Sequence, residues 1–120
     1  MPALVLETNV KVSNPKDFVQ SFSKFSANLL GKPESYISVS YKYNEFLSFH
    51  GTFDPAFLLT ITSLDNITPE LNEAYSKDLF AFFKEELKTP GDRGYVTFYD
   101  PGRAYLGHNG TTFAQIFGSK

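Results

Sequence analysis

The chain has 120 residues and a formal net charge of −2 at pH 7, and it contains no cysteine. This length predicts one domain over residues 1–120, and the charge gives no reason to expect nucleic acid or an anionic membrane as the main partner. The lack of cysteine excludes a disulfide scaffold, a thiolate metal site, a Cys nucleophile and dithiol redox chemistry.

The first ten residues predict a β-strand that starts at the beginning of the chain. Residues 3–6 form an apolar run with no polar leader, so we expect the terminus itself to be packed. If Met1 is removed, Pro2 becomes a secondary amine held inside the fold, which is a candidate base or nucleophile. If Met1 stays, the Pro2 nitrogen is an amide without basicity. The alternative is that Pro2 is an ordinary residue at a strand start, where a missing N–H costs nothing.

Residues 15–31 predict a helix, and residues 36–43 predict a strand. Asn14 before Pro15 is typical of a helix start, and Gly31 is typical of a helix end. The helix carries a stripe of apolar residues at spacings of three and four, namely Phe18, Phe22, Phe25 and Leu29. From residue 36 the pattern has a period of two, which favours a strand.

The second half of the chain repeats this order. Residues 57–64 are β-rich and apolar on both faces, as in a buried strand. A second helix is expected to begin at Thr68 and Pro69 and to stop at residues 89–91, and residues 95–99 predict the next strand.

Shorter segments complete the prediction. Residues 46–49 and 104–106 are expected to form short extra strands. His108-Asn109-Gly110 is a strong signal for a tight turn. Residues 112–117 are expected to form a last edge strand or a tail.

The strand–helix–strand order occurs twice, which predicts an α+β fold. Each crossover implies a parallel strand pair with its helix on one face of the sheet. Two such units predict a four-stranded mixed sheet with both helices on the same side. The other face would be bare although two strands are apolar on both faces, so we expect an oligomer that covers it.

Few residues suggest chemistry by themselves. The two histidines have no other ligand at metal-binding spacing, Ser63 lacks a nucleophile-elbow context, and the glycines do not have a phosphate-binding spacing. No metal and no cofactor are therefore predicted. Pro2, Lys32 and Tyr95 remain, although a solvated loop lysine and a core aromatic are the usual roles of the last two.

Several motifs together resemble one family. The Met-Pro start, Gly31-Lys32-Pro33 and the run from Gly107 to Phe113 (Gly-His-Asn-Gly-Thr-Thr-Phe) occur in the order and near the spacing of macrophage migration inhibitory factor and its relative D-dopachrome tautomerase. The resemblance extends to Ala114, and residues 115–120 form a short extra tail. It implies a homotrimer in which the sheets form a central barrel and the active sites lie between subunits.

The resemblance also implies a keto–enol tautomerase of the phenylpyruvate tautomerase and dopachrome isomerase type, acting on a small aromatic keto acid or a dopachrome-like ring. Pro2 would be the catalytic base after Met1 removal, and Lys32 would hold the substrate carboxylate. The other implied substrate-binding residues are Ser63 and Leu64 through backbone groups, Tyr95 from the neighbouring subunit, and Thr97, Leu106 and Phe113.

The chain departs from the family pattern at several positions. Thr97 stands where Asn is usual, and His108 stands where Trp is frequent, so substrate preference and rate are open. Ala56 and Leu59 replace the Cys-x-x-Cys of some members, which excludes dithiol oxidoreductase activity. An enzyme for another small keto or unsaturated acid, and a cytokine-like protein that binds a cell-surface receptor with vestigial catalysis, stay as alternatives.

No signal peptide pattern is found at the N-terminus, and no apolar run approaches membrane-spanning length. We therefore expect a cytoplasmic protein without membrane insertion, with secretion by a leaderless route as the alternative.

Overall fold

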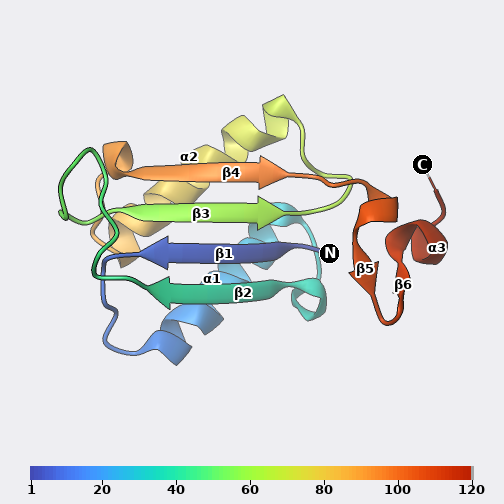
Figure 1. The fold of residues 1–120 in the computed structure, drawn as a ribbon, viewed down its shortest axis with the longest axis horizontal. Coiled ribbons are helices and arrows are strands. Elements are labelled where there is room, and N and C mark those ends of the chain that lie inside the picture. The colour runs from blue at the N-terminus through green and yellow to red at the C-terminus, as the bar shows by residue number, and fades with distance from the viewer. Residues whose placement is uncertain (120) are drawn as a thin grey trace.

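A computed structural model describes residues 1–119 of the chain. Its centre is a four-stranded sheet in the order β2-β1-β3-β4 (Figure 1). The strands are β1 (Ala3–Thr8), β2 (Ser38–Tyr43), β3 (Phe57–Thr62) and β4 (Gly94–Tyr99). The pairs β1–β2 and β3–β4 are parallel, whereas β1 and β3 run antiparallel. The predicted α+β fold with a mixed sheet is confirmed.

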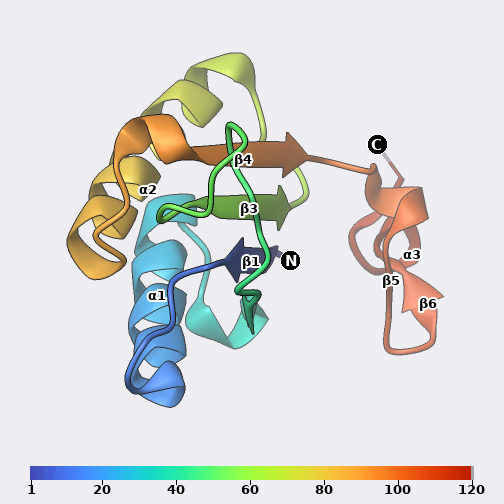
Figure 2. The same cartoon turned by 60° about the vertical axis from the view of Figure 1, so that its left-hand side comes forward.

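Two long helices, α1 (Pro15–Leu30) and α2 (Pro69–Glu86), cover the same face of the sheet (Figure 2). Each begins as predicted, because Asn14 Oδ1 and Thr68 Oγ1 accept backbone N–H groups of the first turn. The end of α1 at Gly31, with φ of 65°, is also confirmed. Helix α2 ends earlier than the predicted stop at residues 89–91.

The early end of α2 has a local cause. Leu87 is the C-cap residue, and Lys88 takes a left-handed conformation with φ of 53°. A left-handed residue cannot continue an α-helix, although glycine is the usual choice for it. Gly91–Arg93 forms a separate 3-10 turn before β4.

The core lies between the sheet and the two helices. Phe22, Phe57 and Phe83 are fully buried there, with the Phe57 and Phe83 ring centroids 4.5 Å apart. Close aromatic pairs of this kind stabilise a core beyond the area they bury. This packing explains why so short a chain contains so many phenylalanines.

The other face of the sheet is open in the single chain. Val5 and Leu58 are 43% and 37% exposed on it, but Thr60 lies opposite Val5 and Thr97 opposite Thr60. The prediction that residues 57–64 are apolar on both faces is therefore wrong in part, because hydroxyl side chains alternate with the buried residues of β3.

The loop between β2 and β3 contains no strand at residues 46–49. Leu47 N–H bonds to Asn44 O in a turn, and Phe49 forms only an isolated bridge with Thr52. The segment has no neighbouring strand to pair with, so its aromatic residues do not produce a strand.

The C-terminal segment lies beyond one end of the sheet (Figures 1 and 2). Gly107–His108 (β5) and Thr111–Thr112 (β6) form a hairpin, and Asn109 and Gly110 have φ of 53° and 82°. The predicted tight turn at residues 108–110 is confirmed.

Two predictions for this segment are wrong. Arg103–Tyr105 is a single 3-10 turn instead of a strand, since Tyr105 N–H bonds to Gly102 O. Phe113–Phe117 is a short helix, α3, instead of an edge strand. Its apolar residues at positions 113, 116 and 117 have helical spacing. Among the described residues, none of the helices has the length and hydropathy needed to cross a bilayer.

Candidate active site at the start of β1

A cavity of about 350 Å³ lies at the start of β1. It is enclosed by the first residues of the chain, the turn before β2, and the C-terminal hairpin. Its lining residues are Met1, Pro2, Ala3, Ser35, Tyr36, Ile37, Ser38, Leu106, Gly107, His108 and Phe113. The chain terminus is thus part of a cavity wall, as its apolar sequence predicts.

Pro2 is buried, and its carbonyl oxygen accepts the Ser38 N–H at 3.0 Å. This bond extends the β1–β2 pairing by one residue and holds Pro2 in place. Burial lowers the pKa of the Met1 α-amine below its ordinary value of 8.0, and the nearby Lys32 ammonium lowers it further. Asp65 and Asp100 act in the opposite direction. The amine at this terminus therefore loses its proton more easily than an ordinary α-amine.

Lys32 reaches this region because α1 ends in a left-handed turn. Its N–H bonds to Ala27 O at 3.1 Å, which turns the chain back toward the start of β1. The side chain is half-buried and acts electrostatically on the terminal amine. Lys32 does not line the cavity, but its charge lies close enough to lower the pKa of the Met1 amine at the cavity wall.

The acidic groups near the amine were not among the predicted site residues. Asp65 forms a salt bridge of 2.9 Å with Arg103. Asp100 accepts the N–H groups of Asp65 and Gly102, both at 2.9 Å. The sequence indicates only a turn at residues 100–102, and the pairing of β3 with β4 is what brings residue 65 beside it.

Ser63 and Leu64 are buried at the end of β3 that lies nearest Pro2. The Ser63 hydroxyl donates to Asn66 Oδ1 at 2.6 Å, and Asn66 Nδ2 donates to Leu30 O at 3.3 Å. The hydroxyl therefore ties the end of β3 to the end of α1. Ser63 and Leu64 do not line the cavity. Their predicted contact with a ligand would be made by their backbone groups.

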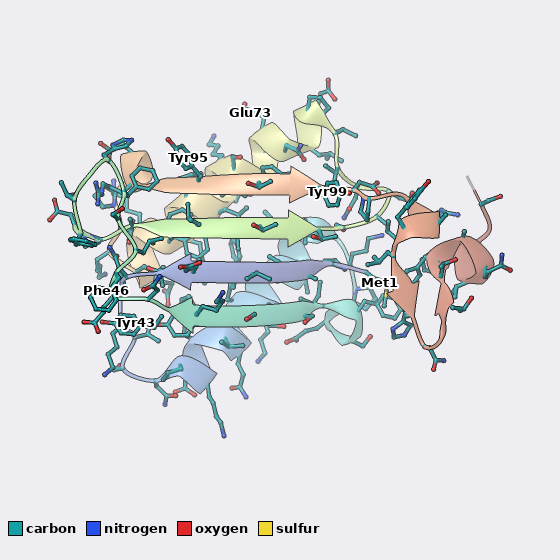
Figure 3. The ribbon with its side chains drawn as sticks, in the orientation of Figure 1. Met1, Tyr43, Phe46, Glu73, Tyr95 and Tyr99 are labelled. Carbon is teal, nitrogen blue, oxygen red and sulfur yellow. The ribbon has the colours of Figure 1, made fainter. Side chains whose placement is uncertain are left out.

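Tyr95 and Thr97 do not meet Pro2 within one chain. Tyr95 is the second residue of β4 and lies at the opposite end of the sheet from Met1 (Figure 3). It is level with Glu7, five residues along β1 from Pro2, which corresponds to about 16 Å of strand. Its ring is 61% exposed and contacts Phe49. Thr97 is exposed on the open face of the sheet.

Leu106 and Phe113 do share the cavity with Pro2. Phe113 is buried and stacks on His108 with ring centroids 5.7 Å apart. Tyr36 also lines the cavity, although it was not among the predicted site residues. The side chain of Tyr36 is 48% exposed, and the sequence pattern did not indicate this exposure.

Metal ligation has no candidate here. Within residues 1–119, no three His, Cys, Asp or Glu side chains gather in a way that could hold a metal ion.

The fold and cavity define a class of α+β protein with two βαβ units and a terminal amine in a pocket at one end of the sheet. Residues 1–114 match the family described as macrophage migration inhibitory factor (MIF). The chain belongs to this family, and its fold is that of the tautomerase superfamily.

Individual relatives agree over nearly their full lengths. The chain is 39% identical over 114 residues to a macrophage migration inhibitory factor homolog of Trichuris trichiura, covering 94% of this chain and 100% of the relative. It is 36% identical over 115 residues to macrophage migration inhibitory factor of Rattus norvegicus, covering 95% and 100%. The structure of the Trichinella spiralis protein superposes with a TM-score of 0.86 at 37% identity, covering 92% of this chain and 99% of that one.

Proposed function

We propose that the protein is a keto–enol tautomerase of the phenylpyruvate tautomerase and dopachrome isomerase type, with Pro2 as the catalytic base once Met1 is removed. The observation that carries the proposal is the cavity at the start of β1, which Pro2 lines and where burial and Lys32 lower the pKa of the Met1 α-amine, the group that the Pro2 amine replaces once Met1 is removed. An amine whose pKa lies closer to neutrality is an efficient base at physiological pH. Membership of the family supports the same reaction class.

In the proposed reaction, Pro2 moves one proton between an oxygen and a carbon of the substrate. For the enol of phenylpyruvate, the Pro2 nitrogen takes the hydroxyl proton as the carbonyl forms, and it returns a proton to the adjacent carbon. No other atom is gained or lost, so no cofactor is required. Lys32 would pair with the substrate carboxylate, while Leu106 and Phe113 would contact the aromatic ring.

The proposal includes a homotrimer whose sheets form a central barrel. Tyr95 lies about 16 Å of strand away from Pro2 in its own chain, so its predicted contact with substrate requires a neighbouring subunit. The exposed Val5 and Leu58 on the open face support a sheet that other subunits enclose. Backbone groups of Ser63 and Leu64, together with Thr97, would complete the site.

The test is conversion of the phenylpyruvate enol to the ketone by protein from which Met1 has been removed, beside a Pro2→Gly variant. Glycine keeps an amine but lacks the ring and the secondary nitrogen. We expect kcat/KM to fall by about a hundredfold or more in the variant. Mass spectrometry on both proteins checks that Met1 is absent. An inactive wild-type protein in this processed form would refute phenylpyruvate tautomerase activity.

A receptor-binding role with weak catalysis is the second candidate. The observation that favours it is the match to relatives named macrophage migration inhibitory factor. The Pro2→Gly variant separates the two functions, because binding to a cell-surface receptor would survive loss of the base.

A further inference from the structure

A second cavity, of about 200 Å³, adjoins the first at the C-terminal segment. The two share Met1, Tyr36, His108 and Phe113 as lining residues, and Ile116 and Phe117 complete the second one. Because Met1 lines both cavities, its removal would widen both of them. The wall that Ile116 and Phe117 form lies beyond residue 114, where the family match ends.

Helix α3 holds this wall in a defined position. Arg103 Nη1 donates to Phe117 O at 3.1 Å and to Gly118 O at 3.0 Å, and its guanidinium lies 5.5 Å from the centre of the Phe117 ring. Arg103 is itself fixed by its salt bridge to Asp65. On the inner side, the Phe117 and Phe113 rings lie 5.1 Å apart. The segment is therefore tied both to the β3 end of the sheet and to the cavity.

The two wall residues are apolar and accessible. Ile116 is 44% exposed and Phe117 is 49% exposed, so each keeps apolar surface that a ligand could cover. An apolar cavity of about 150 Å³ is enough to bind benzene, and this second cavity exceeds that size. It offers room for one further ring or a short alkyl group beyond a substrate already held in the first cavity.

We propose that Ile116 and Phe117 form an apolar distal subsite, which selects aromatic carboxylates that carry an apolar substituent on the far side of the ring. The proposal rests on the proposed function for the orientation of the ligand, with its carboxylate toward Lys32 and its ring between Leu106 and Phe113. Arg103 is a positioning residue in this arrangement, because it holds α3 without facing the cavity.

The test uses two ligands that cannot tautomerise, phenylacetate and 4-biphenylacetate, titrated calorimetrically into Met1-processed full-length protein. We expect Phe117→Ala to reduce the preference for 4-biphenylacetate over phenylacetate by about tenfold, as for loss of a contact in an apolar pocket. Phe117→Leu should retain most of the preference. Gln115→Ala, an exposed neighbour on α3, is the matched control and should retain all of it.

Several outcomes would overturn the distal subsite. One is an unchanged preference for 4-biphenylacetate in Phe117→Ala, and another is an equal loss of affinity for both ligands in that variant. The third is a change in the mass of the Phe117→Ala assembly by light scattering, which would assign the segment to subunit contact. Because binding is measured without turnover, the result does not depend on catalysis. Wild-type protein that binds 4-biphenylacetate more tightly but does not convert phenylpyruvate would support the subsite and refute only the proposed activity.

Discussion

At the scale of single residues, the proposed chemistry depends on the terminal amine and its charged neighbours. Burial is the larger cause of the lowered pKa, and Lys32 is the next. Asp65 and Asp100 oppose them, but both carboxylates are engaged, the first with Arg103 and the second with backbone N–H groups. The balance leaves the amine easier to deprotonate than an ordinary α-amine.

Lys32→Gln should raise the pKa of the terminal amine, that of Met1 or, once Met1 is removed, that of Pro2, because the nearby positive charge is lost while burial remains. The protonated form is the inactive one for a base, so the acid limb of the pH profile of kcat/KM should move to higher pH. An NMR titration of the isotope-labelled terminal residue measures the same pKa directly. Lys24→Gln, an exposed lysine on α1, is the control. An unmoved midpoint in Lys32→Gln would contradict the electrostatic role of Lys32.

At the scale of elements, the two ends of the sheet carry different features. The Pro2 end carries the cavity, and the opposite end carries Tyr95 beside the loop between β2 and β3. That loop is held by polar side chains from other elements. Asn9 Nδ2 donates to the carbonyl oxygens of Leu47, Phe53 and Asp54, and Arg93 donates to those of Phe49, Asp54 and Pro55. Arg93 directly precedes β4, so its bonds to the loop also help to fix Tyr95, whose ring contacts Phe49 of that loop.

The start of β4 leaves no space for a side chain at Gly94. A Cβ there would overlap the ring of Phe57, which is fully buried and cannot move aside. Gly94→Ala should therefore destabilise the protein by about 1–3 kcal/mol, the usual cost of overpacking. Denaturant unfolding measures the loss. Gly91→Ala is the matched control, because its Cβ would meet only Phe80 at 4.0 Å, and it should change stability by less than about 0.5 kcal/mol. Equal stability of the two variants would refute this packing argument.

At the scale of the whole molecule, the separation of Tyr95 from Pro2 makes assembly a requirement of the proposed site. A homotrimer of this 13.5 kDa chain would place one subunit's Tyr95 near the next subunit's Pro2. Cyclic symmetry then repeats the same site between every pair of neighbours.

Mixing two inactive variants tests this arrangement. Pro2→Gly and Tyr95→Ala should each have low activity, but unfolding and refolding them together in equal amounts should restore activity. Under random assembly, about a quarter of the sites combine an intact Pro2 with an intact Tyr95 from the neighbour. Light scattering on the same samples should give three chains per particle. A mixture no more active than the mean of the two variants would mean that both residues act within one chain or that Tyr95 does not act.

The sequence by itself determined the two long helices, the four strands of the sheet and the family. Caps at Asn14 and Thr68, the left-handed Gly31 and the tight turn at residues 108–110 are local signals, because they depend on residues within a few positions of one another. The motif run from the Met-Pro start to Phe113 likewise identified Pro2 and Lys32 as the candidate site, and the cavity includes the first and lies close to the second.

Only the tertiary structure decided which distant residues meet. Asp65 and Arg103 are 38 positions apart and form an ion pair because β3 and β4 run parallel and end together. The same topology separates Tyr95 from Pro2, and the lack of a partner strand lets residues 113–117 take up the helix that their apolar spacing favours. Local preference selects an element, whereas contacts across the fold depend on how the elements pack, and no short stretch of sequence contains that information.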